Sequence, residues 1–308
     1  MKDVPIICAH SMWHSLIPNC HAPAIIHNMN CFLLIKTVLD EAYAEIPGTK
    51  DEKDAAIQKQ MDALSIQYSK LCEKGCLDYS DPARRFAYLF TYTTSHANIV
   101  HARIRASKPL RDIFDRKDVT VGCVGGGPGS DFLGVLKYCE QAKKSPNLTC
   151  HLLDRDPAWG ESWSDVGKKV GGSLQLTTHF NPFDVTDPKK WRVFKKHLQA
   201  DLFTLIYFMS EVYALRENAN PYFNTLFAEM KPGALLLFVD NNSPEFRGWF
   251  DEIANKHNVK ILESEGGVIQ LPTHEEKRDL EPYRTRLKRD PKLSSNVAWR
   301  VLQKKAQQ

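Results

Sequence analysis

A glycine-rich turn between an apolar run and a helical segment constrains this chain more than any other feature. The run Val119–Val124 leads into four glycines among residues 125–129, and the amphipathic segment Ser130–Lys143 follows. Glycines there let a ligand approach the backbone at the carboxyl edge of a sheet, next to the free N–H groups of the following helix. The turn therefore predicts a cofactor cradle in an α/β fold, and a tight turn that binds nothing is the alternative.

Short apolar runs alternate with helical segments after Asp118, as βαβ units around a parallel sheet do. The candidate strands are Val119–Val124, Thr149–Leu153, Leu174–His179, Leu202–Phe208, Ala234–Val239, Val259–Glu263 and Val297–Leu302. A charged segment, Thr273–Lys292, separates the last two strands. Acidic residues interleave with its lysines and arginines, so it is predicted to be a solvated loop, with a phosphate-contacting surface as the alternative.

The first third of the chain has a helical pattern instead. Predicted helices cover Cys31–Ile46 and Asp51–Cys72, and a third begins after Asp81-Pro82 and runs toward Ile104. The change of pattern falls near Lys108–Asp118 and divides the 308 residues into a helical region, 1–110, and an α/β domain, 111–308.

Composition sets only broad limits on function. The 41 basic and 37 acidic residues leave a net charge of +4, which neither requires nor excludes a nucleic-acid partner. No apolar run is long enough to span a bilayer, and the N-terminus lacks the layout of a secretory signal, so a cytoplasmic or nuclear protein with reduced cysteines is expected. The Cys and His residues in the first 31 positions match no common metal-ligand spacing, and no metal is expected.

The spacing of the glycines separates two cofactor classes. A dinucleotide turn needs Gly-x-Gly-x-x-Gly, but counting from Gly125 and Gly127 puts Ser130 at the third position. The pattern Gly-x-Gly-x-Gly is complete at Gly125, Gly127 and Gly129. This spacing resembles motif I of the class I S-adenosylmethionine-dependent methyltransferases. It does not suit an NAD-dependent oxidoreductase, which needs the dinucleotide spacing.

The resemblance extends over roughly residues 111–308 and implies a Rossmann-like, mostly parallel seven-stranded sheet with an antiparallel last strand. Asp154 matches the acidic residue that binds the ribose hydroxyls in this family, and Asp184 matches the residue that accepts from the adenine amine, beside Val185. The cofactor-binding residues that the resemblance implies are Gly125, Gly126, Gly127, Gly129, Asp131, Asp154, Arg155, Asp184, Val185 and Met209.

One position departs from the family pattern. Cys123 stands where the family usually has an acidic residue that contacts the methionine amino group. Another group must then hold that end of the cofactor, such as Asp131 or a residue of the helical third. The departure also keeps open a second class of function, a regulatory module that binds the cofactor without turnover.

The catalytic candidates lie on two parts of the chain. Ser210 and Glu211 follow the fourth strand, where the family places groups near the transferring methyl, and Tyr92 and His96 belong to the third helix. That helix is predicted to lie over the methyl end of the cofactor. The acceptor, a small molecule or RNA methylated on oxygen or nitrogen, stays open, because the Asn/Asp-Pro-Pro-aromatic motif of nucleobase amine methylation is absent after the fourth strand.

Overall fold

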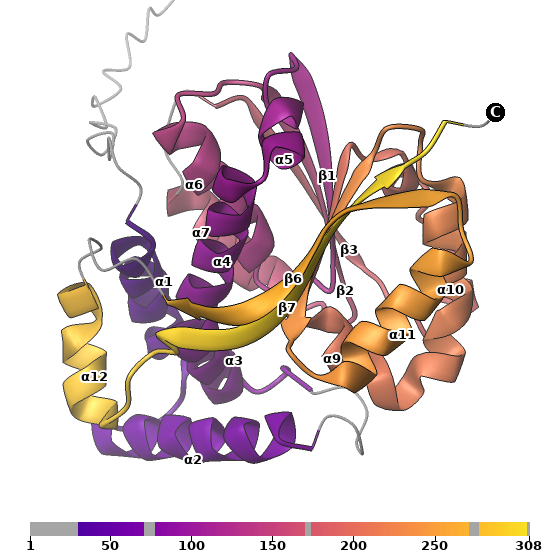
Figure 1. Ribbon diagram of the computed structural model, residues 1–308. Helices are drawn as coiled ribbons and strands as arrows, with labels where there is room; N and C mark the ends of the chain where they lie inside the picture. Colours follow the sequence, from indigo (N-terminus) through magenta and orange to yellow (C-terminus); the bar gives the residue numbers. More distant parts are fainter. Residues whose placement is uncertain (1–29, 71–77, 170–173, 271–276, 307–308) are drawn as a thin grey trace, which may run out of the picture.

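A single mixed sheet forms the centre of the molecule (Figure 1). The computed structural model describes residues 30–70, 78–169, 174–270 and 277–306, and within them seven strands pair in the order β3-β2-β1-β4-β5-β7-β6. The strands are β1 (Asp118–Val124), β2 (Asn147–Asp154), β3 (Leu176–Pro182), β4 (Leu202–Ile206), β5 (Leu235–Asn241), β6 (Val259–Gln270) and β7 (Ser294–Lys304). The first five are parallel, and β7 is antiparallel to both β5 and β6. This is the predicted Rossmann-like fold.

The bounds of the fourth strand and of the last two strands differ from the prediction for physical reasons. The fourth strand stops at Ile206 instead of Phe208, because Tyr207 has a left-handed backbone (φ 56°) and a short helix starts at Phe208. The strands β6 and β7 extend well beyond the predicted apolar runs, because β6 pairs with β7 as far as Gln270 through residues that are mostly exposed. An exposed strand carries little of the apolar signal on which the prediction depended.

Helices cover both faces of the sheet, each with its own hydrophobic cluster. One face carries α6 (Ser130–Gln141) and α7 (Trp159–Lys169), and the other carries α10 (Arg216–Glu229) and α11 (Pro244–Asn255). Short helical segments complete the connections: α8 (Pro188–Trp191), η2 (Lys196–Gln199), α9 (Phe208–Val212) and η3 (Tyr213–Leu215).

The N-terminal helices pack on the α6–α7 face. They are α1 (Cys31–Glu45), α2 (Lys50–Tyr68), α3 (Pro82–Tyr88), a π-helical turn η1 (Leu89–Thr93), α4 (Thr94–Ala106) and α5 (Lys108–Ile113). Their starts carry caps: Thr49 and Glu52 form a capping box, and Asp81 precedes a proline at the first turn. Gly134 lets α4 approach α6, because a Cβ there would lie 2.4 Å from the carbonyl oxygen of Ala97.

The same hydrophobic cluster contains side chains from the helical region and from the α/β region, such as Phe86, Val100 and Phe132. The division at residue 110 stays a prediction about domain organisation. The end of the second predicted helix at Cys72 and the Cys and His residues of positions 1–29 lie outside the described residues.

The charged segment after β6 contains a helix rather than only a loop. Residues 271–276 lie outside the description, and η4 (Lys277–Leu280) and α12 (Glu281–Leu287) follow. Its basic residues form ion pairs: Arg286 with Asp54 of α2 at 2.5 Å, and Arg284 with Glu281 at 2.6 Å. The pair with Asp54 joins α12 to α2, whereas the pair with Glu281 lies within α12. Among the described helices none is both long enough and apolar enough to cross a membrane.

Candidate functional site

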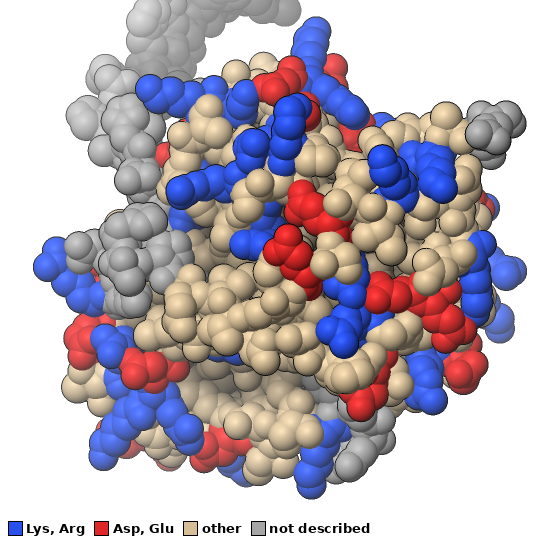
Figure 2. Space-filling model, viewed as in Figure 1, with Lys and Arg blue, Asp and Glu red and all other residues tan. Residues whose placement is uncertain are grey.

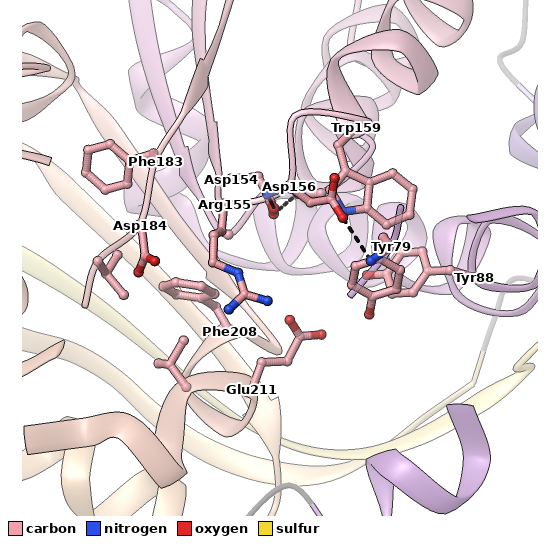
Figure 3. A pocket seen from close by; sticks show the side chains of 14 residues that line it. Tyr79, Tyr88, Asp154, Arg155, Asp156, Trp159, Phe183, Asp184, Phe208 and Glu211 are labelled. Carbon is pink, nitrogen blue, oxygen red and sulfur yellow. Dashed lines mark hydrogen bonds between the residues drawn. The ribbon is translucent and has the colours of Figure 1, made fainter. Parts of the chain in front are cut away.

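A cavity opens at the carboxyl edge of the parallel strands, beside the glycine turn (Figure 3). We call it the glycine-turn cavity. Its lining comes from the ends of β1, β2 and β3, from the start of α9 and from the segment that leads into α3: Tyr79, Tyr88, Gly125, Gly127, Asp154, Arg155, Asp156, Trp159, Phe183, Asp184, Val185, Phe208, Glu211 and Val212. Seven of the fourteen predicted site residues are in this lining, namely Gly125, Gly127, Asp154, Arg155, Asp184, Val185 and Glu211.

The glycines of the turn have different roles. Gly127 (φ 50°) faces open space, since the nearest atom to a Cβ there would be the Tyr88 hydroxyl at 4.0 Å. At Gly125 a Cβ would lie 2.0 Å from the ring of Phe208, and at Gly129 2.2 Å from the ring of Trp163. Gly127 therefore keeps the cavity open, whereas Gly125 and Gly129 make room for aromatic side chains.

Asp154, at the end of β2, ties the turn to the next strand. Its Oδ2 accepts a hydrogen bond from the Gly127 N–H at 2.9 Å, and its Oδ1 accepts one from the Asp156 N–H at 3.0 Å. Burial raises the pKa of Asp154 to about 6, against these hydrogen bonds, which lower it. Each carboxylate oxygen has two lone pairs, so Asp154 can still accept from a ligand.

Aromatic rings from α3, from the segment before it and from the start of α7 line one side of the cavity (Figure 3). Asp156 Oδ2 accepts a hydrogen bond from the Tyr79 N–H at 2.8 Å, which draws that segment to the cavity. The Tyr79 ring lies 4.7 Å from the Trp159 ring, and the Tyr88 ring lies 5.2 Å from each of the other two. The helical region thus closes one side of the cavity.

Asp184, after β3, lies on the other side (Figure 3). Its Oδ1 accepts from the Thr186 N–H at 2.9 Å and from the Thr186 hydroxyl at 2.6 Å. These bonds to one oxygen fix the carboxylate and leave Oδ2 for a ligand.

Glu211, on α9, points into the cavity toward Arg155 (Figure 3). Its Oε1 accepts a hydrogen bond from the Tyr68 hydroxyl at 2.8 Å, and the hydroxyl oxygens of Tyr68 and Tyr79 are hydrogen-bonded at 2.9 Å. Burial raises the pKa of Glu211 to about 8, although the Tyr68 hydrogen bond lowers it. A carboxyl group with a pKa in this range can accept and release a proton near neutral pH.

The structure does not place the other predicted site residues in this lining. Asp131 is buried, accepts from the Thr204 hydroxyl at 2.7 Å, and has its pKa raised by burial to about 7. Met209 lies in the hydrophobic cluster of the α10–α11 face, and the Ser210 N–H donates to Asp240 at 2.9 Å. Gly126 packs against Cys123. These four residues pack beneath the lining instead of facing the cavity.

Cys123 itself lies in the core, with its sulfur 3.9 Å from that of Cys150. The described cysteines, Cys31, Cys123, Cys139 and Cys150, are free thiols. The described residues contain no cluster of three or more His, Cys, Asp or Glu side chains that could hold a metal ion.

Tyr92 and His96 line a second, neighbouring cavity of about 300 Å³. We call it the Lys292 cavity. It lies beside the ends of β4 and β5, the C-terminal end of α2 and the π-helical turn, and its lining is Tyr68, Ser69, Tyr92, His96, Tyr207, Asn241, Ser243, Phe246 and Lys292. The third predicted helix therefore does reach the site, but Tyr88 faces the glycine-turn cavity whereas Tyr92 and His96 face its neighbour.

The π-helical turn explains why three rings of this helix follow one another. Tyr88, Tyr92 and His96 follow one another at intervals of four residues. The centres of the Tyr88 and Tyr92 rings are 5.3 Å apart, and those of the Tyr92 and His96 rings are 5.9 Å apart. Residues four apart drift around a regular α-helix, and a wider π turn reduces that drift. Such turns occur frequently at functional sites.

The known proteins that this chain resembles are methyltransferases. The sequence resembles the class I methyltransferases in its glycine turn and strand ends, and the sheet order and direction fit that resemblance. No model of a known protein family matches the chain. The 25S rRNA (uridine(2843)-N(3))-methyltransferase of Saccharomyces cerevisiae is 22% identical over 244 residues, which cover 67% of this chain and 63% of that protein. The chain thus spans less than two thirds of the length of this relative.

Two solved structures are similar to this chain as well. The plantazolicin methyltransferase BpumL, in complex with SAH, has a TM-score of 0.41 and 14% identity, with 81% of this chain and 99% of that chain covered. The 16S rRNA methylase ArmA has a TM-score of 0.42 and 11% identity, with 79% and 97% covered.

Proposed function

We propose that this protein transfers a methyl group from S-adenosylmethionine to a uracil base of RNA. The observation that carries the cofactor assignment is the open space at Gly127, inside a cavity that two strand-end carboxylates, Asp154 and Asp184, flank. A side chain at Gly127 would fill this cradle. The resemblance of the sequence supports the same assignment.

The residues of the cavity fit the chemical groups of this cofactor. Asp154 can accept from two ribose hydroxyls and Asp184 from an adenine amine, while the rings of Trp159, Phe183 and Phe208 provide apolar contact for a base. When bound, the cofactor supplies a methyl group on a positively charged sulfur that needs no further activation. The protein then has to position the acceptor and exclude water.

Glu211 is the candidate general base. It lies in the lining of the cavity, accepts a hydrogen bond from Tyr68 and has a pKa raised to about 8. An N–H or O–H acceptor must lose its proton when it is methylated, and a carboxylate with a pKa near neutral pH can take it.

RNA is favoured over a small molecule as the acceptor because the yeast relative carries an rRNA uridine in its name. A cytoplasmic or nuclear location agrees with this substrate. A cofactor-binding module without turnover is the second candidate, since Cys123 is a buried thiol where a carboxylate contacts the amino group in related enzymes.

Calorimetry with S-adenosylhomocysteine and with NADH, followed by radiolabelled methyl transfer to RNA, tests the proposal. We expect micromolar binding of S-adenosylhomocysteine, no binding of NADH, and label in uridine-containing RNA. Binding without transfer to any RNA would favour the regulatory module, and binding of NADH alone would contradict the cofactor assignment.

A further inference from the structure

The Lys292 cavity shares a wall with the glycine-turn cavity. Tyr68 lines the Lys292 cavity, and its hydroxyl donates to Glu211 of the other cavity at 2.8 Å. The ring of Tyr92 lies 5.3 Å from the ring of Tyr88, which faces the glycine turn. A group bound in the Lys292 cavity would therefore be separated from Glu211 only by tyrosine side chains.

The cavity contains a cation with no ion-pair partner among the residues that the structure describes. The Lys292 backbone N–H donates to the Thr91 carbonyl at 2.8 Å, which fixes the start of the side chain. Its ammonium lies 4.9 Å from the centre of the Tyr207 ring and 5.8 Å from that of Tyr92. Burial lowers the pKa of Lys292. The Asp240 carboxylate raises this pKa in turn, although no ion pair joins the two groups within the described part of the chain. A partly buried ammonium without a direct carboxylate partner is unfavourable and favours a ligand that brings negative charge or strong acceptor oxygens.

The rest of the lining is uncharged and mostly aromatic. The His96 ring stacks on the Tyr207 ring at 4.5 Å and 19°, and burial lowers the pKa of His96 to about 3, so this ring is neutral. Tyr207 holds its place through a left-handed backbone (φ 56°), a strained conformation for a residue with a side chain. Asn241 adds an amide that can both donate and accept.

Aromatic faces with one cation and one amide are suited to a planar heterocycle that carries carbonyl oxygens. We propose that the Lys292 cavity binds the acceptor uracil, turned out of a single RNA strand, and that Lys292 contacts a ring carbonyl oxygen and stabilises the negative charge of the deprotonated ring. This inference rests on the proposed function and assigns its substrate site. A base must leave its stack to reach a buried reactive group, as enzymes that modify bases require.

The chemical step is balanced by groups already named. At the shared wall, the N3 proton of the uracil passes to the Tyr68 hydroxyl oxygen while that hydroxyl gives its own proton to the Glu211 carboxylate, which lies 2.8 Å away, and the N3 electron pair forms a bond to the methyl carbon. The carbon–sulfur bond breaks with its electron pair on sulfur, so the sulfonium of the methyl donor becomes a neutral thioether. Lys292 lowers the energy of the anion that precedes attack, because it places a positive charge beside the carbonyl oxygen that shares the negative charge.

The test uses the full chain and a single-stranded oligoadenylate with one uridine. We expect Lys292→Met to lower kcat/KM for this acceptor by about 10- to 100-fold, the range for losing a hydrogen bond to a charged group, with unchanged affinity for S-adenosylhomocysteine. Lys260→Met, at an exposed lysine of β6, is the matched control and should behave as the wild type.

A second acceptor separates a role in charge stabilisation from a role in folding. An oligonucleotide with 5-fluorouridine has a more acidic N3 proton, so it depends less on Lys292 and should recover much of the activity that Lys292→Met loses. An equal loss with both acceptors, or no loss with either, would contradict the role of Lys292.

Binding of the same oligonucleotide, measured by calorimetry in the presence of S-adenosylhomocysteine, is independent of turnover. We expect the wild type to bind it more tightly than Lys292→Met and more tightly than an all-adenosine control. Equal binding of all combinations would overturn this inference, whereas failure of S-adenosylhomocysteine to bind at all would overturn the proposed function instead.

Discussion

The two walls of the glycine-turn cavity have different origins. The wall on the sheet side consists of strand ends and a tight turn, and backbone N–H groups hold its two carboxylates. Asp154 accepts from Asp156 two residues away and from Gly127 on the neighbouring strand's turn, and Asp184 accepts from Thr186 two residues away. The wall on the helical side consists of side chains from distant parts of the chain, such as Tyr68, which donates to a carboxylate 143 residues away. The first wall depends on local motifs and the second on tertiary packing.

This difference suggests a division of labour. The sheet-side wall has the groups that suit the cofactor, and the helical wall separates the cofactor region from the Lys292 cavity, where the acceptor is proposed to bind. Substitutions in the two walls should therefore have different effects on cofactor affinity and on turnover.

Figure 2 shows that the face across β6 and β7 has a broad uncharged band, with basic side chains gathered farther up this face.

Glu211, which touches both walls, should show the largest effect. Glutamine keeps an oxygen for the Tyr68 hydroxyl but cannot accept a proton, so Glu211→Gln should lower turnover by roughly 10²-fold or more. Affinity for S-adenosylhomocysteine should change little. The exposed Glu217→Gln is the control, and turnover within a few-fold of the wild type in Glu211→Gln would remove the base from the account.

Asp154→Ala is the sheet-side counterpart. It removes the acceptor of the Gly127 N–H and a group for the ribose, and should weaken binding of S-adenosylhomocysteine by roughly 1.5–3 kcal/mol. Calorimetry measures this directly, with Asp187→Ala, at the partly exposed N-cap of α8, as the control. An effect of only a few tenths of a kcal/mol would mean that another carboxylate holds the cofactor, and Asp156 would be the first to examine.

Tyr68→Phe removes one hydroxyl from the helical wall and should act on pH dependence. The hydroxyl lowers the pKa of Glu211 by donating to it, so its loss raises that pKa above about 8. The base form then appears at higher pH, and the rise of kcat/KM with pH should move to the alkaline side, with reduced activity at pH 7. Tyr283→Phe, whose hydroxyl donates to Asp40, should leave the profile unchanged. A profile that moves toward acid would contradict the assigned hydrogen bond.

Met209→Leu should have the smallest effect. The side chain lies in the core of the α10–α11 face, and the exchange nearly conserves volume, so it should cost less than about 1.5 kcal/mol of stability. Affinity for S-adenosylhomocysteine should stay within about twofold. A large loss of affinity would restore the predicted role of Met209 as a direct ligand.

The sheet-side wall could be predicted from the sequence because its signals are local. An apolar strand, a fixed glycine spacing and an acidic strand end identified Gly127, Asp154 and Asp184, and the fold followed from the alternation of strands and helices. The same reasoning also assigned Gly126, Asp131, Met209 and Ser210 to the site. These residues do not line the cavity, because adjacent residues of a turn or helix point in different directions, and their roles stay predictions.

The helical wall could be predicted only in part. The aromatic residues of the third helix indicated a role near the site, but the π-helical turn that sets which ring faces which cavity has no simple sequence signal. Tyr79, Tyr88 and Phe208 were not predicted as site residues, and neither were Tyr68 and Lys292. Their positions depend on how distant segments pack, so their sequence context alone does not bring them together.

The central claim is that the open space at Gly127 is where the cofactor binds, and a matched pair of substitutions tests it most directly. Gly127 (φ 50°) and Gly233 (φ 82°) both have a left-handed backbone and a Cβ direction without close contacts, so valine strains the backbone at both. Only Gly127→Val should abolish binding of S-adenosylhomocysteine in calorimetry while circular dichroism still shows a folded protein. Wild-type affinity in Gly127→Val, or equal losses in both variants, would contradict the account.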